Sequence, residues 1–289
     1  MLLWIAVVLG VVQGLFMFLP VSSTAHLVLT QHWLIRQGYD LPAPESPEMI
    51  LFDLVLHVGT LVSIALVFWK SLSRVVAGGV RDTWAWVSSG GDAGRELLFL
   101  RLGLLCALSV LATAVIGFSL KASFEWVFAN PLAVAGTLTM TGILLWWTDR
   151  LSPRLRGLRR FTPSMAAVIG IAQGFALMPG LSRSGMTITF ALFVGLKRRW
   201  AAEYSFFLAI PTILAATLVQ SFSVIRDTGL SGLDWPALAV GFVVAAVVGV
   251  VSLKLVVFLL LRARLKVFSF YLWALALLVA FGFLDHGTL

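Results

Sequence analysis

The sequence predicts an all-α polytopic membrane protein, formed as a single integral membrane domain over residues 1–289. The chain is 60% hydrophobic, only 12% of its residues are charged, and its mean hydropathy is +1.00. A water-soluble protein of this length carries far more charge. The apolar residues also gather in long stretches, several of them about 20 residues long, which is the length that crosses a bilayer as a helix.

Six apolar stretches are long enough, or nearly so, to cross roughly 30 Å of hydrocarbon. They lie at 50–69, 98–119, 127–147, 203–223, 236–261 and 267–284. Two further apolar regions are interrupted, 2–34 by Pro20 and 163–196 by Pro179-Gly180, and serines follow each break. Because proline removes a helical hydrogen bond, we expect each region to form a pair of half-helices.

The two interrupted regions resemble one another. Gly10 to Gly14 reads GVVQG and Gly170 to Gly174 reads GIAQG, and a proline followed by serine comes after each. The chain therefore contains a predicted internal duplication, with repeat A over 1–148 and repeat B over 163–289.

The loop charges predict how the two repeats are oriented. Loops 70–101 and 149–160 are rich in arginine, which marks the cytoplasmic side, whereas 36–48 is acidic. The net charge of +8 is therefore a topology signal and does not indicate nucleic-acid binding. Region 163–196 lies between basic loops and should dip in from inside, while region 2–34 should dip in from outside. This predicts an inverted-topology repeat of six transmembrane helices plus two re-entrant helical hairpins, with hairpin tips that meet near the midplane.

One cation lies inside an apolar region. Arg183 is surrounded by the run MPGLSRSGMT, and an arginine at the centre of a membrane helix costs about 2.5–3.5 kcal/mol. We therefore expect Arg183 to bind an anion. Phosphate recognition also needs hydroxyl groups and a closely approaching backbone, and a helix beginning near Gly185 would add its free N–H groups. The run supplies these at Gly180, Ser182, Ser184, Gly185 and Thr187.

The break in the first region carries hydroxyl groups and a histidine, at Ser22, Ser23, Thr24 and His26. Histidine titrates near neutrality, so His26 is a candidate for proton transfer. Structural alternatives stay open for each of these residues. The hydroxyl residues could simply cap the following half-helix, and His26 could be a core or interfacial histidine. Gln13 and Gln173 could contact substrate or hydrogen-bond across the repeat interface.

These residues together resemble the undecaprenyl pyrophosphate phosphatase family, the BacA-type bacitracin-resistance proteins. The resemblance rests on Gln13-Gly14 with Phe18 to His26, then on Phe52-Asp53 with His57 to Thr60, then on Pro179 to Thr187. It implies a hydrolase that converts C55 isoprenyl pyrophosphate to the monophosphate plus phosphate. This reaction recycles the lipid carrier of peptidoglycan synthesis and confers bacitracin resistance. The resemblance also implies the bacterial plasma (inner) membrane, with the site toward the outer, periplasmic side, and membrane lipids as partners.

The resemblance assigns catalytic roles to Ser23, His26 and Arg183. Substrate-binding roles fall to the matching or neighbouring positions Gln13, Ser22, Thr24, Gly180, Ser182, Ser184 and Thr187. Asp53 and His57 lie four residues apart, hence on one helix face, and are auxiliary candidates. Asp53 could orient His57 or reach toward the phosphates, or it could be an interfacial or capping carboxylate.

Two positions depart from the family pattern: Phe16 replaces the usual small polar residue, and, more seriously, Met17 stands where the family has glutamate. The resemblance implies a divalent cation, Mg²⁺ or Ca²⁺, but a thioether neither accepts a proton nor holds a hard cation, which prefers oxygen ligands. The alternative function is therefore a catalytically impaired homologue that acts as a polyprenyl-phosphate binder or transporter (a flippase). The sequence leaves the oligomeric state open.

Overall fold

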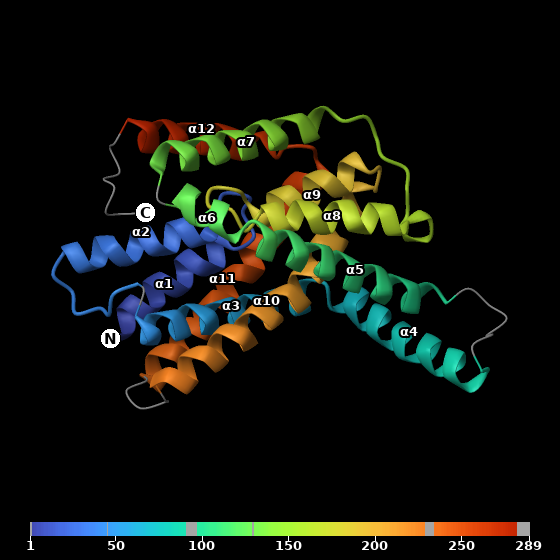
Figure 1. Cartoon of the computed structure of the whole chain (residues 1–289), viewed down its shortest axis with the longest axis horizontal. Coiled ribbons are helices and arrows are strands. Elements are labelled where there is room, and N and C mark those ends of the chain that lie inside the picture. The colour runs from blue at the N-terminus through green and yellow to red at the C-terminus, as the bar shows by residue number, and fades with distance from the viewer. Residues whose placement is uncertain (1, 45, 91–96, 129, 229–233, 282–289) are drawn as a thin grey trace.

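The computed structural model describes residues 2–44, 46–90, 97–128, 130–228 and 234–281, and within these ranges the chain is helical (Figure 1). The one β-type pairing there is an isolated bridge between Arg156 and Leu196. The helices in chain order are α1 (Leu3–Phe16), α2 (Ser23–Arg36), α3 (Pro47–Val67), α4 (Trp69–Ser88), α5 (Leu98–Ser119), α6 (Lys121–Phe128), α7 (Pro131–Arg150), the short 3₁₀ helix η1 (Leu158–Arg160), α8 (Pro163–Phe175), α9 (Arg183–Phe193), α10 (Arg198–Thr228), α11 (Trp235–Leu261) and α12 (Lys266–Ala280).

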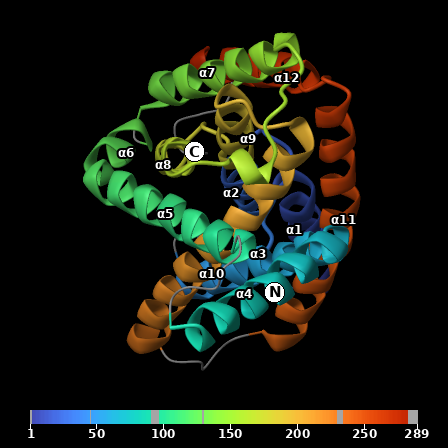
Figure 2. The same ribbon diagram turned by 90° about the vertical axis from the view of Figure 1, so that its right-hand side faces the viewer.

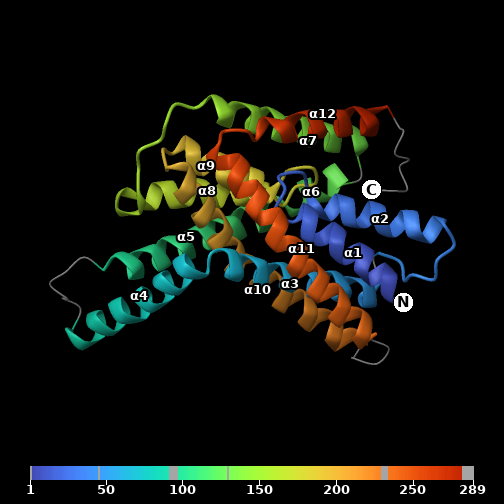
Figure 3. The same ribbon diagram turned by 180° about the vertical axis from the view of Figure 1, so that it is seen from behind.

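Four of the described helices, α3, α5, α10 and α11, are long and apolar enough to cross a membrane. They confirm four of the predicted stretches, and α5 has the predicted limits of 98–119. Most of the remaining two stretches, 127–147 and 267–284, lies in α7 and α12, which pack side by side along one edge of the molecule (Figure 1 and Figure 3). Residues 129 and 282–284 of these stretches lie outside the described residues.

The segment 70–101, which we expected to be a loop, contains α4. Its exposed side chains Val76, Val80, Trp84 and Val87 recur every three or four residues and form one apolar stripe. On another side of the helix, the buried Asp82 carboxylate accepts a hydrogen bond from the Phe99 N–H at 2.8 Å, which ties α4 to the start of α5. The loop prediction was wrong here because the stripe is too narrow to raise the hydropathy of the whole segment.

Both interrupted regions form two helices joined by a short irregular loop, as predicted. Residues 17–22 connect α1 to α2, and residues 176–182 connect α8 to α9. Each loop includes a residue with positive φ, Ser22 at 69° and Gly180 at 84°. Such a backbone cannot continue a right-handed helix, so these residues and the prolines enforce the breaks.

Glycines on α1 and α8 let these two helices pack closely on long helices that are distant in the sequence. Helix α1 packs on α11 and α8 packs on α5, so that α5 and α11 flank the two pairs (Figure 2). A Cβ at Gly14 would lie 2.7 Å from the Ala245 carbonyl oxygen, and one at Gly170 would lie 2.3 Å from the Ser109 carbonyl oxygen. Glycine therefore allows the backbones at both contacts to approach this closely.

We expect Gly170→Ala to destabilise the fold by about 1–3 kcal/mol, because its methyl group has no space against α5. Gly103→Ala is the matched control, since a Cβ at Gly103 has no neighbour within 4 Å. This control should leave stability unchanged or raise it. Thermal unfolding in detergent measures both variants, and equal midpoints for the two would contradict the packing described.

Candidate active site

The two loops meet in the interior of the molecule. The Ser184 hydroxyl donates to the Phe18 carbonyl oxygen at 3.2 Å, and the Arg183 guanidinium Nη2 lies 3.8 Å from the Met17 sulfur. A Cβ on Gly185 would lie 3.3 Å from the Pro20 Cβ, so the loops are in close contact there as well. The predicted meeting of the two breaks is confirmed.

A cavity of about 440 Å³ opens beside this contact. Its walls come from both loops, from α3 and from the second half of α10. Apolar walls with a few convergent polar groups are typical of small-molecule sites. The polar lining residues are Ser22, Ser23, Thr24, Asp53, His57, Ser182, Arg183, Ser184, Thr212, Thr217 and Gln220.

Arg183 is the first residue of α9, and its neighbours Ser182 and Ser184 line the cavity beside it. The Ser182 hydroxyl accepts from the Gly185 N–H at 3.2 Å and so caps the helix. Within the described ranges no carboxylate lies at ion-pair distance from Arg183. The cavity therefore contains an uncompensated guanidinium at a helix N-terminus, which is an arrangement that favours an anion.

Met17 occupies the centre of the contact between the loops. Its sulfur lies 3.5 Å from Gln13 Nε2, 3.8 Å from the Ser23 hydroxyl and 3.8 Å from Arg183 Nη2. A thioether is a weak acceptor and carries no charge. The side chain at position 17 therefore touches both Ser23 and Arg183 without neutralising the arginine.

Asp53 and His57 line the cavity from α3, on the shared face that their spacing predicts. The Asp53 carboxylate accepts from Gln31 Nε2 at 2.9 and 3.1 Å, while His57 Nδ1 donates to the Asp53 backbone carbonyl at 2.8 Å. Of the alternatives for Asp53, its backbone and not its carboxylate contacts His57. Asp53 is also not a cap, because Ser46 caps α3.

His26 does not line the cavity, and both of its ring nitrogens are engaged. Nδ1 lies 2.8 Å from the Ser22 carbonyl oxygen, Nε2 pairs with the Tyr271 hydroxyl of α12, and the ring stacks on Phe16. Ser22 precedes α2 with a left-handed backbone and makes no side-chain capping bond, so the expected cap is absent there. A non-glycine residue in this conformation is strained, and His26 holds its carbonyl in place.

Of the ten residues assigned by resemblance, six line the cavity: Ser22, Ser23, Thr24, Ser182, Arg183 and Ser184. The other four, Gln13, His26, Gly180 and Thr187, do not. Gly180 packs against α7, where a Cβ would lie 2.1 Å from Thr137 Oγ1, and the Thr187 hydroxyl pairs with Ser205. Gln13 is fully buried and reaches the site only through Met17.

Gln173 was expected either to contact substrate or to hydrogen-bond to neighbouring helices, and the structure shows hydrogen bonds to neighbouring helices. Its Nε2 donates to the Thr113 hydroxyl at 3.1 Å and to the Thr212 hydroxyl at 3.0 Å, and so joins α8 to α5 and α10. Three polar lining residues, Thr212, Thr217 and Gln220, were not expected. They follow Pro211 at helical spacing, but their sequence carries no phosphate-binding motif that would have indicated a site.

The chain matches the family described as Bacitracin resistance protein BacA over residues 6–278. An undecaprenyl-diphosphatase of Alkalilimnicola ehrlichii is 66% identical over 285 residues, covering 99% of this chain and 98% of the relative. One from Halorhodospira halophila is 63% identical, covering 99% of both chains, and one from Carboxydothermus hydrogenoformans is 34% identical, covering 95% of both. The match extends over both loops, the cavity and the flanking helices, and the chain belongs to the bacitracin resistance protein BacA family.

Proposed function

We propose that this protein is an undecaprenyl pyrophosphate phosphatase that converts C55 isoprenyl pyrophosphate to the monophosphate plus phosphate. The observation that carries this proposal is the uncompensated Arg183 at the start of α9, in one cavity with Ser23. The names of the relatives that match nearly the whole chain support the substrate. In this function the protein recycles the peptidoglycan lipid carrier and confers bacitracin resistance.

The cavity contains the groups that phosphoryl transfer requires. Arg183, the Ser182 hydroxyl and the α9 N-terminus stabilise the charge on the terminal phosphoryl group, while Ser184 ties this wall to the facing loop through the Phe18 carbonyl. Ser23 attacks the terminal phosphorus, the bridging P–O bond breaks, and the lipid monophosphate leaves. Water then hydrolyses the phosphoserine and releases phosphate. In the alternative reaction no phosphoserine forms, and Ser23 positions a water molecule that attacks the terminal phosphorus directly.

Two histidines are candidates for proton transfer. The resemblance assigns this role to His26, whose ring nitrogens contact Ser22 and Tyr271, whereas His57 lines the cavity. His26 can act on the reaction either by exchanging protons through these partners or by holding the Ser22 backbone in place beside Ser23.

We expect His26→Asn to lower kcat about tenfold, because Ser22 loses the contact that holds its left-handed backbone. Adding Ser22→Gly should restore most of this loss, since glycine adopts positive φ without strain. Ala263→Gly, at the other non-glycine position of positive φ among the described residues, is the matched control and should restore nothing. A loss that Ser22→Gly leaves unchanged would instead favour direct proton transfer by His26.

A divalent cation held by the protein fits this donor set poorly. No group of three His, Cys, Asp or Glu side chains that could hold a metal occurs in the described part of the chain. Asp53 is the single carboxylate among the described lining residues, and Gln31 donates to both of its oxygens. We therefore propose that Mg²⁺ or Ca²⁺, where it takes part, arrives on the pyrophosphate.

For the membrane topology, we propose the inverted repeat of six transmembrane helices and two re-entrant hairpins, with the cavity open to the periplasmic side of the inner membrane. The basic loops support this orientation, since 149–160 and 197–199 flank the α8–α9 pair. The test places a cysteine at Lys197 in a Cys106→Ala background. Labelling of this cysteine from outside intact cells would overturn the orientation.

The second candidate function is a polyprenyl-phosphate binder or transporter with the same site. Met17 favours it, because a thioether stands where Ser23 and Arg183 converge and offers neither a proton acceptor nor a charge. Phosphate release from C55 pyrophosphate by the purified protein decides between the two. Steady turnover supports the phosphatase, whereas tight binding of the lipid with no release of phosphate supports the binder.

A further inference from the structure

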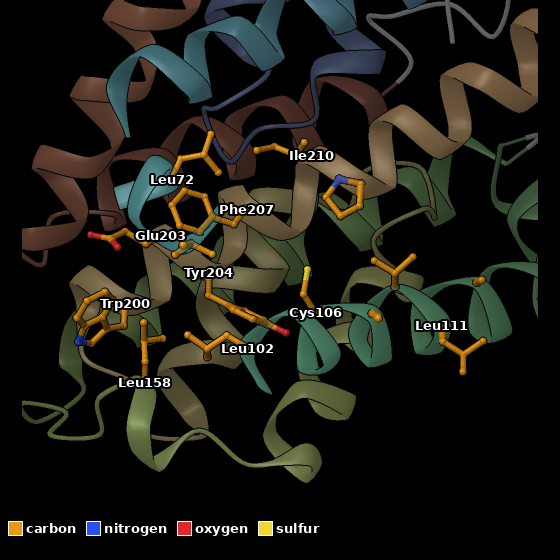
Figure 4. Close-up of a pocket in the computed structure, with 16 residues that line it drawn as sticks. Leu72, Leu102, Cys106, Leu111, Leu158, Trp200, Glu203, Tyr204, Phe207 and Ile210 are labelled. Carbon is orange, nitrogen blue, oxygen red and sulfur yellow. The ribbon is translucent and has the colours of Figure 1, made fainter. Parts of the chain in front are cut away.

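A second cavity lies away from the phosphate site. It is a groove of about 680 Å³ between α4, α5 and α10, with Leu158 of η1 at one end. Figure 4 shows Trp200 and Leu111 near its two ends, with Cys106, Tyr204 and Phe207 between them. Its volume is within the range of small-molecule sites.

The groove is almost entirely apolar. Its walls are built from side chains such as Leu72, Leu102, Val110, Phe207 and Ile210. The Tyr204 hydroxyl is turned into the protein, where it pairs with the Ser109 hydroxyl at 2.7 Å.

The charged group of the groove is at the Trp200 end. There the Glu203 carboxylate is paired with Arg199 at 2.9 Å and accepts a hydrogen bond from the Ser71 hydroxyl at 2.5 Å. A ligand within the groove therefore meets mostly hydrocarbon and aromatic surface.

Helix α10 connects the groove to the phosphate cavity. Six of its residues between Trp200 and Pro211 line the groove, and five between Thr212 and Gln220 line the cavity. Pro211 lies inside α10 and interrupts its backbone hydrogen bonding. At this residue the side chains of α10 change from lining the groove to lining the phosphate cavity.

Helix α5 forms a second connection. Gly103, Ala107, Val110 and Ala114 line the groove along one face, and Gly117 is the next residue of that face. A Cβ at Gly117 would lie 2.6 Å from Leu177, which lines the phosphate cavity. From Gly103 to Gly117 this face extends about 21 Å.

We propose that this groove binds part of the isoprenoid chain of the lipid whose phosphates occupy the Arg183 cavity. The proposal rests on the proposed function for the identity of that lipid. The groove's apolar walls suit a hydrocarbon chain. The groove adjoins the phosphate site where α10 lines both cavities and where Gly117 of α5 meets Leu177, and this favours the substrate's own chain over the acyl chain of an unrelated phospholipid. Burial of the distal chain would then let the protein favour long polyprenyl substrates over short ones.

The test fills the groove from one position. Gly103 lines it, and a Cβ there has no neighbour within 4 Å, so we expect the ring of Gly103→Phe to occupy part of the groove. Gly136→Phe is the matched control, because Gly136 on α7 has equally open surroundings and lines neither cavity. We expect Gly103→Phe to raise KM for C55 pyrophosphate about tenfold and to leave KM for C15 pyrophosphate unchanged. Gly136→Phe should change neither value.

An equal change for both chain lengths, or no change for either, would overturn the proposal. Absence of turnover by the unaltered protein would refute the proposed function instead, and a binding measurement then tests the groove separately. A polyprenyl monophosphate with a photoreactive group on its distal end should crosslink to peptides of α5 and α10, and less so in Gly103→Phe. Crosslinks elsewhere, or crosslinks abolished by excess phosphatidylglycerol, would show that the groove is not the site of this chain.

Discussion

Replacing Arg183 with alanine is expected to lower kcat/KM for C55 pyrophosphate by about 10³. The guanidinium is the only Lys or Arg side chain among the described residues that line the cavity, and no carboxylate pairs with it there. Loss of this charge would leave the phosphate oxygens with uncharged donors such as hydroxyl and helix N–H groups. Phosphate release by the purified variant measures the effect.

Two controls separate charge, geometry and folding. Arg183→Lys keeps the charge but loses the planar fork, so we expect an intermediate loss. Arg198→Ala removes an arginine that donates to the carbonyl oxygens of Thr148 and Leu260, at the ends of α7 and α11. That variant should lose stability while the folded protein keeps its turnover. Retention of full activity by Arg183→Ala would remove the basis of the proposed site.

Replacing Met17 with glutamate is expected to raise phosphate release by about 10². The Met17 sulfur lies 3.8 Å from both the Ser23 hydroxyl and the Arg183 guanidinium, so a carboxylate at this position reaches both groups. It would add a proton acceptor beside Ser23 and an oxygen ligand for a cation carried by the pyrophosphate. Turnover measured with Mg²⁺ and with a chelator reports both changes, and we expect Met17→Glu to depend on the cation more strongly than the unaltered protein.

Met17→Gln is the matched control for this change, because glutamine has similar length and carries oxygen but no charge. We expect it to stay near the unaltered protein. A fall in activity with Met17→Glu would indicate that the carboxylate neutralises Arg183 and blocks phosphate binding, which contradicts a catalytic use of position 17. If only Met17→Glu turns over substrate, the unaltered chain is the binder of the second candidate function.

Local features of the sequence were enough to predict most of the helices. Apolar length alone located α5 and α11, because a helix in hydrocarbon satisfies its own backbone and needs only an apolar surface. Proline and glycine located the breaks, since their effect on the backbone is also local. Helix α4 was missed because its apolar residues form one stripe among basic and small residues.

The site was predicted in part, for the same reason. Ser182, Arg183 and Ser184 are neighbours in sequence and remain neighbours at the start of α9. The pairing of His26 with Tyr271 joins residues 245 apart, and no local pattern indicates it. The bonds from Gln31 to Asp53 likewise depend on how α2 meets α3.

The sequence by itself determined the helical membrane architecture, the two broken regions and the cation at the centre of one of them, because hydropathy, backbone freedom and the cost of a buried charge act at single positions. Only the tertiary structure decided which side chains share the cavity. It placed His57 there and His26 outside, set Met17 between Ser23 and Arg183, and formed the groove between α4, α5 and α10. The physical reason is that a cavity is bounded by side chains from helices distant in the chain, and the helix contacts that bring them together are set by close packing over many residues.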